Sequence, residues 1–288
     1  MNITDLGDMP FAVAKKQVVS VSERYSVVTR KGNRYTLTTT QSIPILAHEW
    51  GHVLFYESAR VHFEFLEKID MLDVKLDEIK SKLQIAYKEA MDLEKSANLY
   101  PDKDAYRKLM EESQTEYFKL VEESELIKGQ LNQINEVFIP YKLRSGPYDE
   151  FWGDVISMLY TENPAAIYNT LDMRADDAYI SAERRKEIVR RNPVAHINHL
   201  SKPESIHTKL REAMEFLWDQ YLKKPSVMKR KADIAPAVLK ALFSELQWAM
   251  SFPLKEDLET EDPLDVGFMK TQNDRLKKAL QRELADFK

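Results

Sequence analysis

The chain contains no cysteine, which excludes disulfide bonds, cysteine zinc ligands and thiol catalysis. Its 288 residues include no apolar run near the ~20 residues that a membrane-spanning helix needs. The chain also lacks an excess of positive charge, because it has 42 basic and 47 acidic residues and a net charge of −5. Nucleic acid is therefore not expected as a partner, since binding it requires basic residues that neutralise phosphates. With 43% hydrophobic and 31% charged residues, the composition predicts a soluble chain of one large or two ordinary domains.

The N-terminal segment also lacks a recognisable export signal. Residues 1–14 show no charged region followed by an apolar one, so no signal peptide is predicted. The chain as written is expected to be cytoplasmic, and exported if a leader has been removed.

The most informative motif is H-E-W-G-H, from His48 to His52. Two histidines at positions i and i+4 lie on one face of a helix, one turn apart. That spacing lets both imidazoles reach one zinc ion, with Glu49 beside the water that the metal activates.

A second motif downstream supplies a candidate third ligand. Glu150 and Asp154 form E-x-x-x-D in a segment whose apolar residues recur at helical spacing, so the two carboxylates share a face. Two histidines and Glu150 leave a fourth zinc position open, as in catalytic sites. Asp154 is placed to accept the second ring N–H of His48 or His52.

With both motifs in place, the chain resembles the gluzincin superfamily of zinc metallopeptidases, which have a thermolysin-like site. The resemblance covers about two short helices. It implies one zinc ion per chain bound by His48, His52 and Glu150, with Glu49 as general base and Asp154 orienting a ligand. The metzincin pattern does not fit, because Phe55 and Ser58 occupy the places of its glycine and third histidine.

A weaker similarity concerns the group that stabilises the oxyanion. The segment Ile206 to Arg211 resembles a His-containing helix start of some gluzincin-like proteins, which makes His207 the candidate. His196 and His199 are rivals, and each of these three could equally be an ordinary surface or core histidine. His62 is expected at the base of the hairpin described below, outside the site.

Glycine is scarce, with 7 residues, and two of them lie within the motif helices. Glycine in a helix interior destabilises it by roughly 1 kcal/mol relative to alanine. Gly51 precedes His52 and Gly153 precedes Asp154, and a close approach of the two helices would give a physical reason for both. The alternative is that the two glycines fall at these positions by chance.

The predicted fold is α+β and mostly α. Residues 17–40 are rich in β-branched and aromatic residues and predict a small antiparallel sheet beside the zinc-site helices, with a turn at residues 31–33. In the architecture that the gluzincin resemblance implies, an edge strand of this sheet would hold an extended peptide by backbone pairing. Residues 1–59 and 140–288 together form the predicted peptidase domain, the latter as its helical remainder.

Residues 60–139 predict an antiparallel coiled-coil hairpin inserted between the two motifs. Apolar and small residues alternate by three and four on both sides of a break near Pro101. The hairpin returns the chain to its origin, so that Glu150 can meet His52. It is also a candidate surface for a protein partner.

Two interpretations compete with the zinc peptidase. The histidines could be buried, hydrogen-bonded core residues, with Glu150 and Asp154 on a solvated face. Alternatively, the chain could be a gluzincin-like protein with little or no activity that serves as a binding scaffold through its hairpin. Metal content and the activity of a Glu49→Gln variant separate these interpretations.

Overall fold

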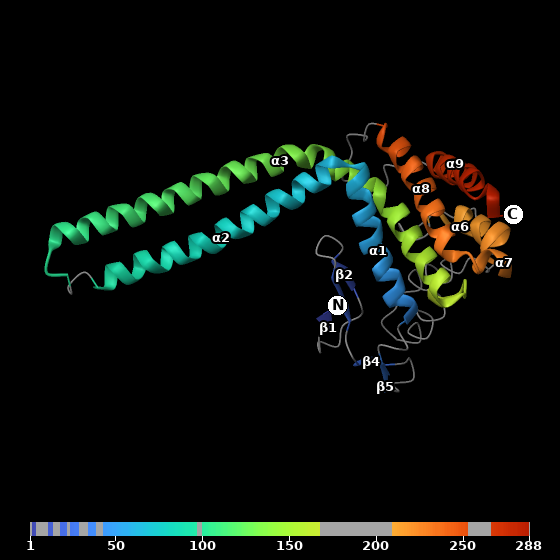
Figure 1. Cartoon of the computed structure of the whole chain (residues 1–288), viewed down its shortest axis with the longest axis horizontal. Coiled ribbons are helices and arrows are strands. Elements are labelled where there is room, and N and C mark those ends of the chain that lie inside the picture. The colour runs from blue at the N-terminus through green and yellow to red at the C-terminus, as the bar shows by residue number, and fades with distance from the viewer. Residues whose placement is uncertain are drawn as a thin grey trace. The chain divides into compact units, whose positions relative to one another are not determined.

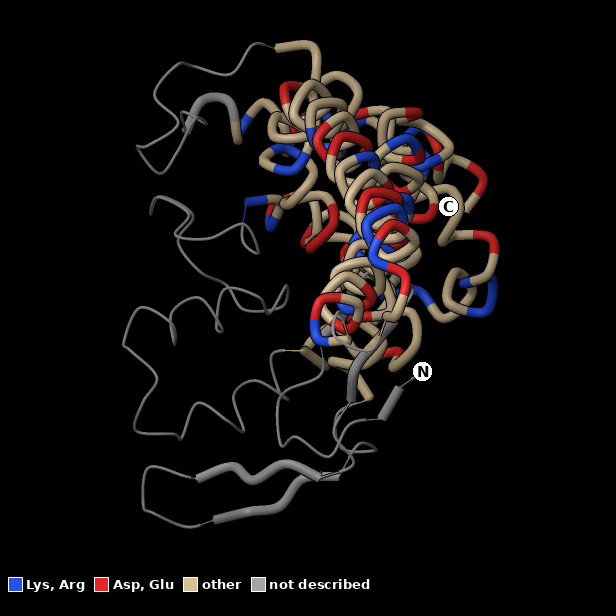
Figure 2. The backbone as a smooth tube through the Cα atoms, turned by 90° about the vertical axis from the view of Figure 1, so that its left-hand side faces the viewer, with Lys and Arg blue, Asp and Glu red and all other residues tan. Residues whose placement is uncertain are grey.

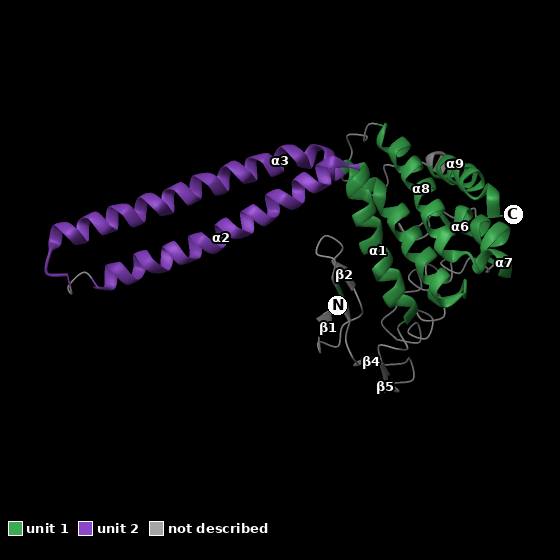
Figure 3. Ribbon diagram, in the orientation of Figure 1, with its two compact units in different colours: residues 1–62, 140–288 green, residues 63–139 purple. Residues whose placement is uncertain are grey.

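The computed structural model is mostly helical and forms two compact units (Figure 3). The first unit contains residues Met1–His62 and Pro140–Lys288, and the second contains Phe63–Ile139. The sequence prediction had placed the inserted hairpin at residues 60–139. The described residues are 2–3, 11–13, 18–21, 24–28, 34–38, 43–96, 100–167, 209–252 and 266–287.

The second unit is a helical hairpin. Helix α2 (Glu64–Ser96) packs antiparallel against the first part of α3 (Lys103–Thr161), and the two run side by side in Figure 1. The predicted antiparallel pairing is confirmed. The buried core of the hairpin consists of residues from one face of each helix: Ile69, Leu72, Leu76, Ile79, Ala86, Leu120, Ile127 and Ile134.

Local interactions explain where α3 begins, and charged residues form ion pairs along its surface. The Asp102 carboxylate accepts hydrogen bonds from the backbone N–H groups of Asp104 and Ala105, at 2.9 and 3.1 Å, and so caps the helix. Basic and acidic residues are interspersed along the described helices (Figure 2), and some form pairs one turn apart, such as Lys128 with Glu125.

The first unit is built on α1 (Ile43–His62), the later part of α3, and a C-terminal group of helices. Helix α8 packs on α9 and contacts α1, where Phe55 stacks on Phe243 with ring centroids 5.0 Å apart. No described helix has the length and apolar character needed to cross a bilayer. The C-terminal elements are α6 (Arg211–Leu217), a π-helix (Trp218–Leu222), α7 (Pro225–Met228), α8 (Lys231–Met250), α9 (Val266–Glu283) and a 3₁₀ turn (Ala285–Phe287).

The strands of the first unit differ from the single antiparallel sheet that the sequence predicted. One sheet has the order β1-β3-β2, in which β1 pairs parallel and β2 antiparallel with β3, and β4 and β5 form a separate antiparallel pair. Strands β2 and β3 contact α1, where Val19 packs on Val53. The strands are β1 (Asn2–Ile3), β2 (Phe11–Val13), β3 (Val18–Val21), β4 (Arg24–Val28) and β5 (Arg34–Thr38).

Helix α3 also differs from the prediction, which treated the second motif as part of a separate short helix. The helix continues from Lys103 to Thr161 through Pro140 and Pro147. Each proline removes one backbone donor, and packed helix on both sides can offset that loss. Pro140 coincides with the boundary between the two units.

Candidate metal centre

Helix α1 places two imidazoles next to each other. The Nε2 atoms of His48 and His52 lie 3.1 Å apart, and the rings meet edge to face with centroids 4.6 Å apart. Together with Glu49 they form a group whose ligand-type atoms all lie within 4.8 Å of one another. This His-Glu-His group could hold a metal ion.

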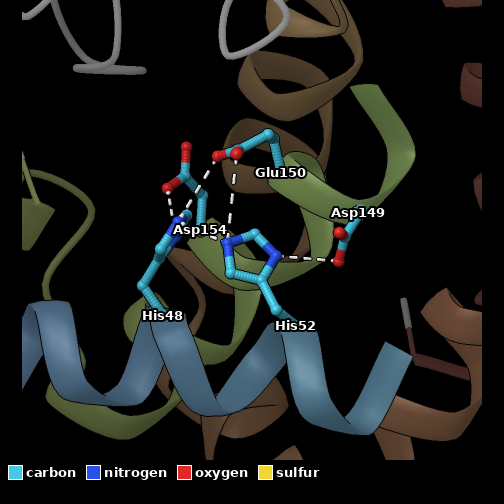
Figure 4. Close-up of polar contacts among 5 residues, drawn as sticks. All are labelled: His48, His52, Asp149, Glu150 and Asp154. Carbon is cyan, nitrogen blue, oxygen red and sulfur yellow. Dashed lines mark hydrogen bonds and ion pairs between the residues drawn. The ribbon is translucent and has the colours of Figure 1, made fainter. Parts of the chain in front are cut away.

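Helix α3 brings a carboxylate to the same two nitrogen atoms (Figure 4). The Glu150 carboxylate lies 3.4 Å from His48 Nε2 through one oxygen and 3.9 Å from His52 Nε2 through the other. The side chains of all three residues are at most 14% exposed. Three potential ligands from two helices therefore converge in a largely buried place.

The opposite nitrogen of each ring faces a carboxylate. His48 Nδ1 lies 3.0 Å from Asp154 Oδ1, and His52 Nδ1 lies 2.8 Å from Asp149 Oδ1. Because an ionised carboxylate can only accept a hydrogen bond, it favours the tautomer with the proton on Nδ1. That tautomer leaves the Nε2 lone pair of each ring available to a metal.

These distances fit a zinc ion. Zinc binds histidine nitrogen at about 2.0–2.1 Å in a tetrahedron, so its ligand atoms should lie roughly 3.4 Å from one another. The two nitrogens lie 3.1 Å apart, and different oxygens of Glu150 lie 3.4 and 3.9 Å from them, so these separations surround that value. Two Nε2 lone pairs 3.1 Å apart also repel each other unless a proton or a cation lies between them.

Two glycines allow the helices to come this close. A Cβ atom on Gly51 would lie 2.7 Å from the Gly153 Cα atom, and one on Gly153 would lie 2.6 Å from His48 Nδ1. Real Cβ atoms do not approach other atoms so closely, and the first contact is with backbone, which cannot rotate away. The predicted close approach at these glycines is confirmed.

The two helices run in opposite directions where they cross. His48 on α1 meets Asp154 on α3, Gly51 meets Gly153, and His52 meets Asp149, so the earlier residue of one helix faces the later residue of the other. Glu150 lies between these pairs and approaches the Nε2 atoms of both histidines.

Burial and the nearby Asp149 carboxylate have opposite effects on the pKa of His52. Burial, the largest effect, lowers the pKa of His52, whereas the hydrogen bond and charge of Asp149 raise it. The nearby His48 lowers this pKa and Glu150 raises it, and the net result is a pKa above the ordinary 6.5. A proton therefore competes with a metal ion for this imidazole.

The turn of α3 that carries Glu150 is held by the C-terminal helices. Tyr148 is fully buried, and its hydroxyl accepts a hydrogen bond of 3.2 Å from Gln272 Nε2 on α9. Burial is the main reason that the pKa of Tyr148 is raised, so the phenol remains neutral. Arg144, also buried, donates to the carbonyl oxygen of Ala249 near the end of α8.

The structure brings together five of the residues singled out in the sequence: His48, Glu49, His52, Glu150 and Asp154. His62 lies elsewhere on α1, with its ring stacked on Phe243 at a centroid distance of 4.6 Å. The proposed oxyanion residue His207 lies outside the described residues, as do its rivals His196 and His199.

Asp149, which contacts His52, is not among the site residues predicted from the sequence. It precedes Glu150 directly, but its neighbour across the helix crossing could not be known without the relative position of α1 and α3. The available signal was the Asp-Glu pair at the start of the second motif.

Comparison of the chain with protein-family models, curated proteins and solved structures finds no match. The assignment of a function therefore depends on the site itself.

Proposed function

We propose that this chain is a zinc-dependent peptidase of the gluzincin type. The observation that carries the proposal is the convergence of His48 Nε2, His52 Nε2 and the Glu150 carboxylate at separations of 3.1 to 3.9 Å. Two neutral imidazoles and one carboxylate form a ligand set typical of catalytic zinc, which keeps one coordination position open. His48, His52 and Glu150 would hold one ion per chain.

The chemistry is shared between the ion and the protein. When bound, zinc would act as a Lewis acid that lowers the pKa of water to about 7 and polarises a carbonyl group. Glu49 lies between the two histidines in the chain and belongs to the same cluster. Its carboxylate would accept a proton from the attacking water and deliver that proton to the leaving amine.

The surrounding residues would keep the ligands in place. Asp154 would hold His48 through its Nδ1 atom, and the crossing at Gly51 and Gly153 would keep Glu150 within reach of both rings. His207 stays the candidate for oxyanion stabilisation.

The adjacent sheet supports a peptide as the substrate. Strand β2 lies at one edge of the three-stranded sheet and contacts α1, the helix that carries Glu49. An edge strand presents unpaired backbone groups, which can bind an extended peptide as an additional strand.

The test is a comparison of zinc-loaded wild type with Glu49→Gln on a broad peptide library, read by mass spectrometry. Removing a general base should lower cleavage by about 100-fold or more, whereas zinc content should stay unchanged. Glu57→Gln, on the same helix but paired with Arg60 at 3.3 Å, is the matched control and should cleave like wild type. Absence of cleavage by zinc-loaded wild type, or equal cleavage by Glu49→Gln, would overturn the proposal.

A second candidate function is a scaffold that binds a protein partner through the hairpin. It is favoured by large apolar side chains on the hairpin surface, including Ile85, Tyr87, Phe118 and Leu126, each between 58% and 64% exposed. A protein that binds zinc but cleaves nothing would favour this candidate.

A further inference from the structure

A second carboxylate, in addition to Asp154, supports the proposed ligands. Asp149 Oδ1 lies 2.8 Å from His52 Nδ1, the shortest of the four contacts between a carboxylate and a site histidine in the described residues. The two residues are 97 positions apart in the chain and belong to different helices. Their contact thus depends on the same crossing of α1 and α3 that brings Glu150 to the histidines.

The two histidines are not held in the same way. The His48 side chain is 7% exposed, and its ring lies so close to the Gly153 backbone that a Cβ atom there would be 2.6 to 2.7 Å from it. Packing therefore restricts how the His48 ring can rotate. Its carboxylate partner, Asp154, is also well covered, at 13% exposed.

His52 lies nearer to solvent than His48. Its side chain is 14% exposed and that of Asp149 is 34% exposed. The contacts of this ring with described residues are the hydrogen bond to Asp149, the edge contact with His48, and the approach of Glu150. Of these, only the bond to Asp149 acts on Nδ1, the nitrogen opposite the one that would bind a metal.

We propose that Asp149 is the positioning residue that holds His52 in the tautomer and orientation needed for metal binding. As hydrogen-bond acceptor, it keeps the proton on Nδ1 and points Nε2 towards His48 Nε2 and Glu150. Its negative charge also favours a divalent cation next to the ring. The inference rests on the metal site of the proposed function and requires no peptide cleavage.

The test measures zinc affinity by competition with a chromophoric chelator at one fixed pH. We expect Asp149→Ala to weaken binding by about 10- to 100-fold, the range typical of groups that orient a metal ligand. Asp149→Asn should lose less, because its amide oxygen can accept the same hydrogen bond without the charge. Asp104→Asn removes an aspartate from the same helix at a 94% exposed position and is expected to bind like wild type.

Two further measurements separate positioning from a general effect on the fold. At alkaline pH, where His52 is neutral, the melting temperature and far-ultraviolet circular dichroism of the metal-free Asp149→Asn protein should match those of Asp104→Asn. With cobalt(II) in place of zinc, the visible absorption bands of Asp149→Ala should differ from those of wild type, because they report ligand geometry and alanine cannot accept the hydrogen bond. Wild-type zinc affinity and wild-type cobalt bands in both Asp149 variants would overturn the inference.

The inference and the proposed function can fail separately. Weakened zinc binding in the Asp149 variants, with no peptide cleavage by wild type, would support the positioning role and overturn the peptidase. Peptide cleavage by wild type, with unchanged zinc affinity in the variants, would support the peptidase and overturn the positioning role. A wild-type protein that binds no zinc would overturn both.

Discussion

Replacing Gly51 with alanine should disturb the metal centre through the backbone alone, without changing any proposed ligand. The new Cβ atom would lie 2.7 Å from Gly153 Cα and 3.4 Å from Ile156 Cβ. Ordinary contacts between carbon atoms are about 3.5–4.0 Å, so the two helices would have to separate by about 1 Å. The Glu150 carboxylate, already 3.9 Å from His52 Nε2, would move further from the histidines.

The effect on stability is the difference between two opposing contributions. Alanine favours a helix interior by about 1 kcal/mol over glycine, whereas overpacking in a dense core costs about 1–3 kcal/mol. The free energy of unfolding of the metal-free protein should therefore fall by about 0–2 kcal/mol, as measured by urea denaturation. Zinc affinity should fall by about 10- to 100-fold, because a change that moves a supporting group has effects of this size.

Gly129→Ala is the matched control. This glycine lies on α3, the same helix as Gly153, and an added Cβ would meet nothing within 4 Å. The variant should gain up to about 1 kcal/mol of stability and keep wild-type zinc affinity. If Gly51→Ala bound zinc as tightly as Gly129→Ala, the reasoning from the helix crossing would be refuted.

The remaining predictions concern pH and the hairpin. Zinc affinity, measured by chelator competition, should weaken as the pH falls through the raised pKa of His52, which lies above 6.5, because the ion must displace a proton. In the metal-free protein, the fold is more stable at acid pH, because protonated His52 stabilises it below pH 6.5. This stability is lost as the pH rises through the folded-state pKa of His52. The urea-unfolding difference between wild type and Asp149→Asn should therefore be larger at acid than at alkaline pH, and an equal difference at both would contradict the assignment. Cysteines at Ile79 and Leu120, both in the hairpin core, should crosslink within one chain, whereas crosslinks only between chains would indicate a dimer. Replacing residues 70–132 by a short Gly/Ser linker should leave zinc affinity unchanged, because every proposed ligand lies outside that span.

Much of the site could be predicted because helix periodicity is a local property. The i and i+4 spacing of His48 and His52 places them on one face of any helix, and the same holds for Glu150 and Asp154. The apolar residues that recur by three and four along α2 and α3 likewise indicate which helix faces must be buried. Glycine in a helix interior is unfavourable, so the two motif glycines indicated a close approach.

The features that were missed depend on how distant segments meet. Asp149 became a partner of His52 only through the direction and register of the crossing between α1 and α3. The contact of Tyr148 with Gln272, 124 positions later, is equally invisible in either local sequence. The parallel pairing of β1 with β3 also joins separate segments, and their local sequences do not specify the direction of pairing.

The most direct test of the central claim is the zinc content of wild type and Glu150→Ala after equilibration with a small excess of zinc and removal of the free ion. Glu150 is the proposed ligand on α3, and its carboxylate lies 3.4 Å from His48 Nε2. The proposed zinc site predicts one zinc per chain in wild type and a large loss in Glu150→Ala, with the fold retained by circular dichroism. Absence of zinc from wild type, or equal zinc in both proteins, would contradict it.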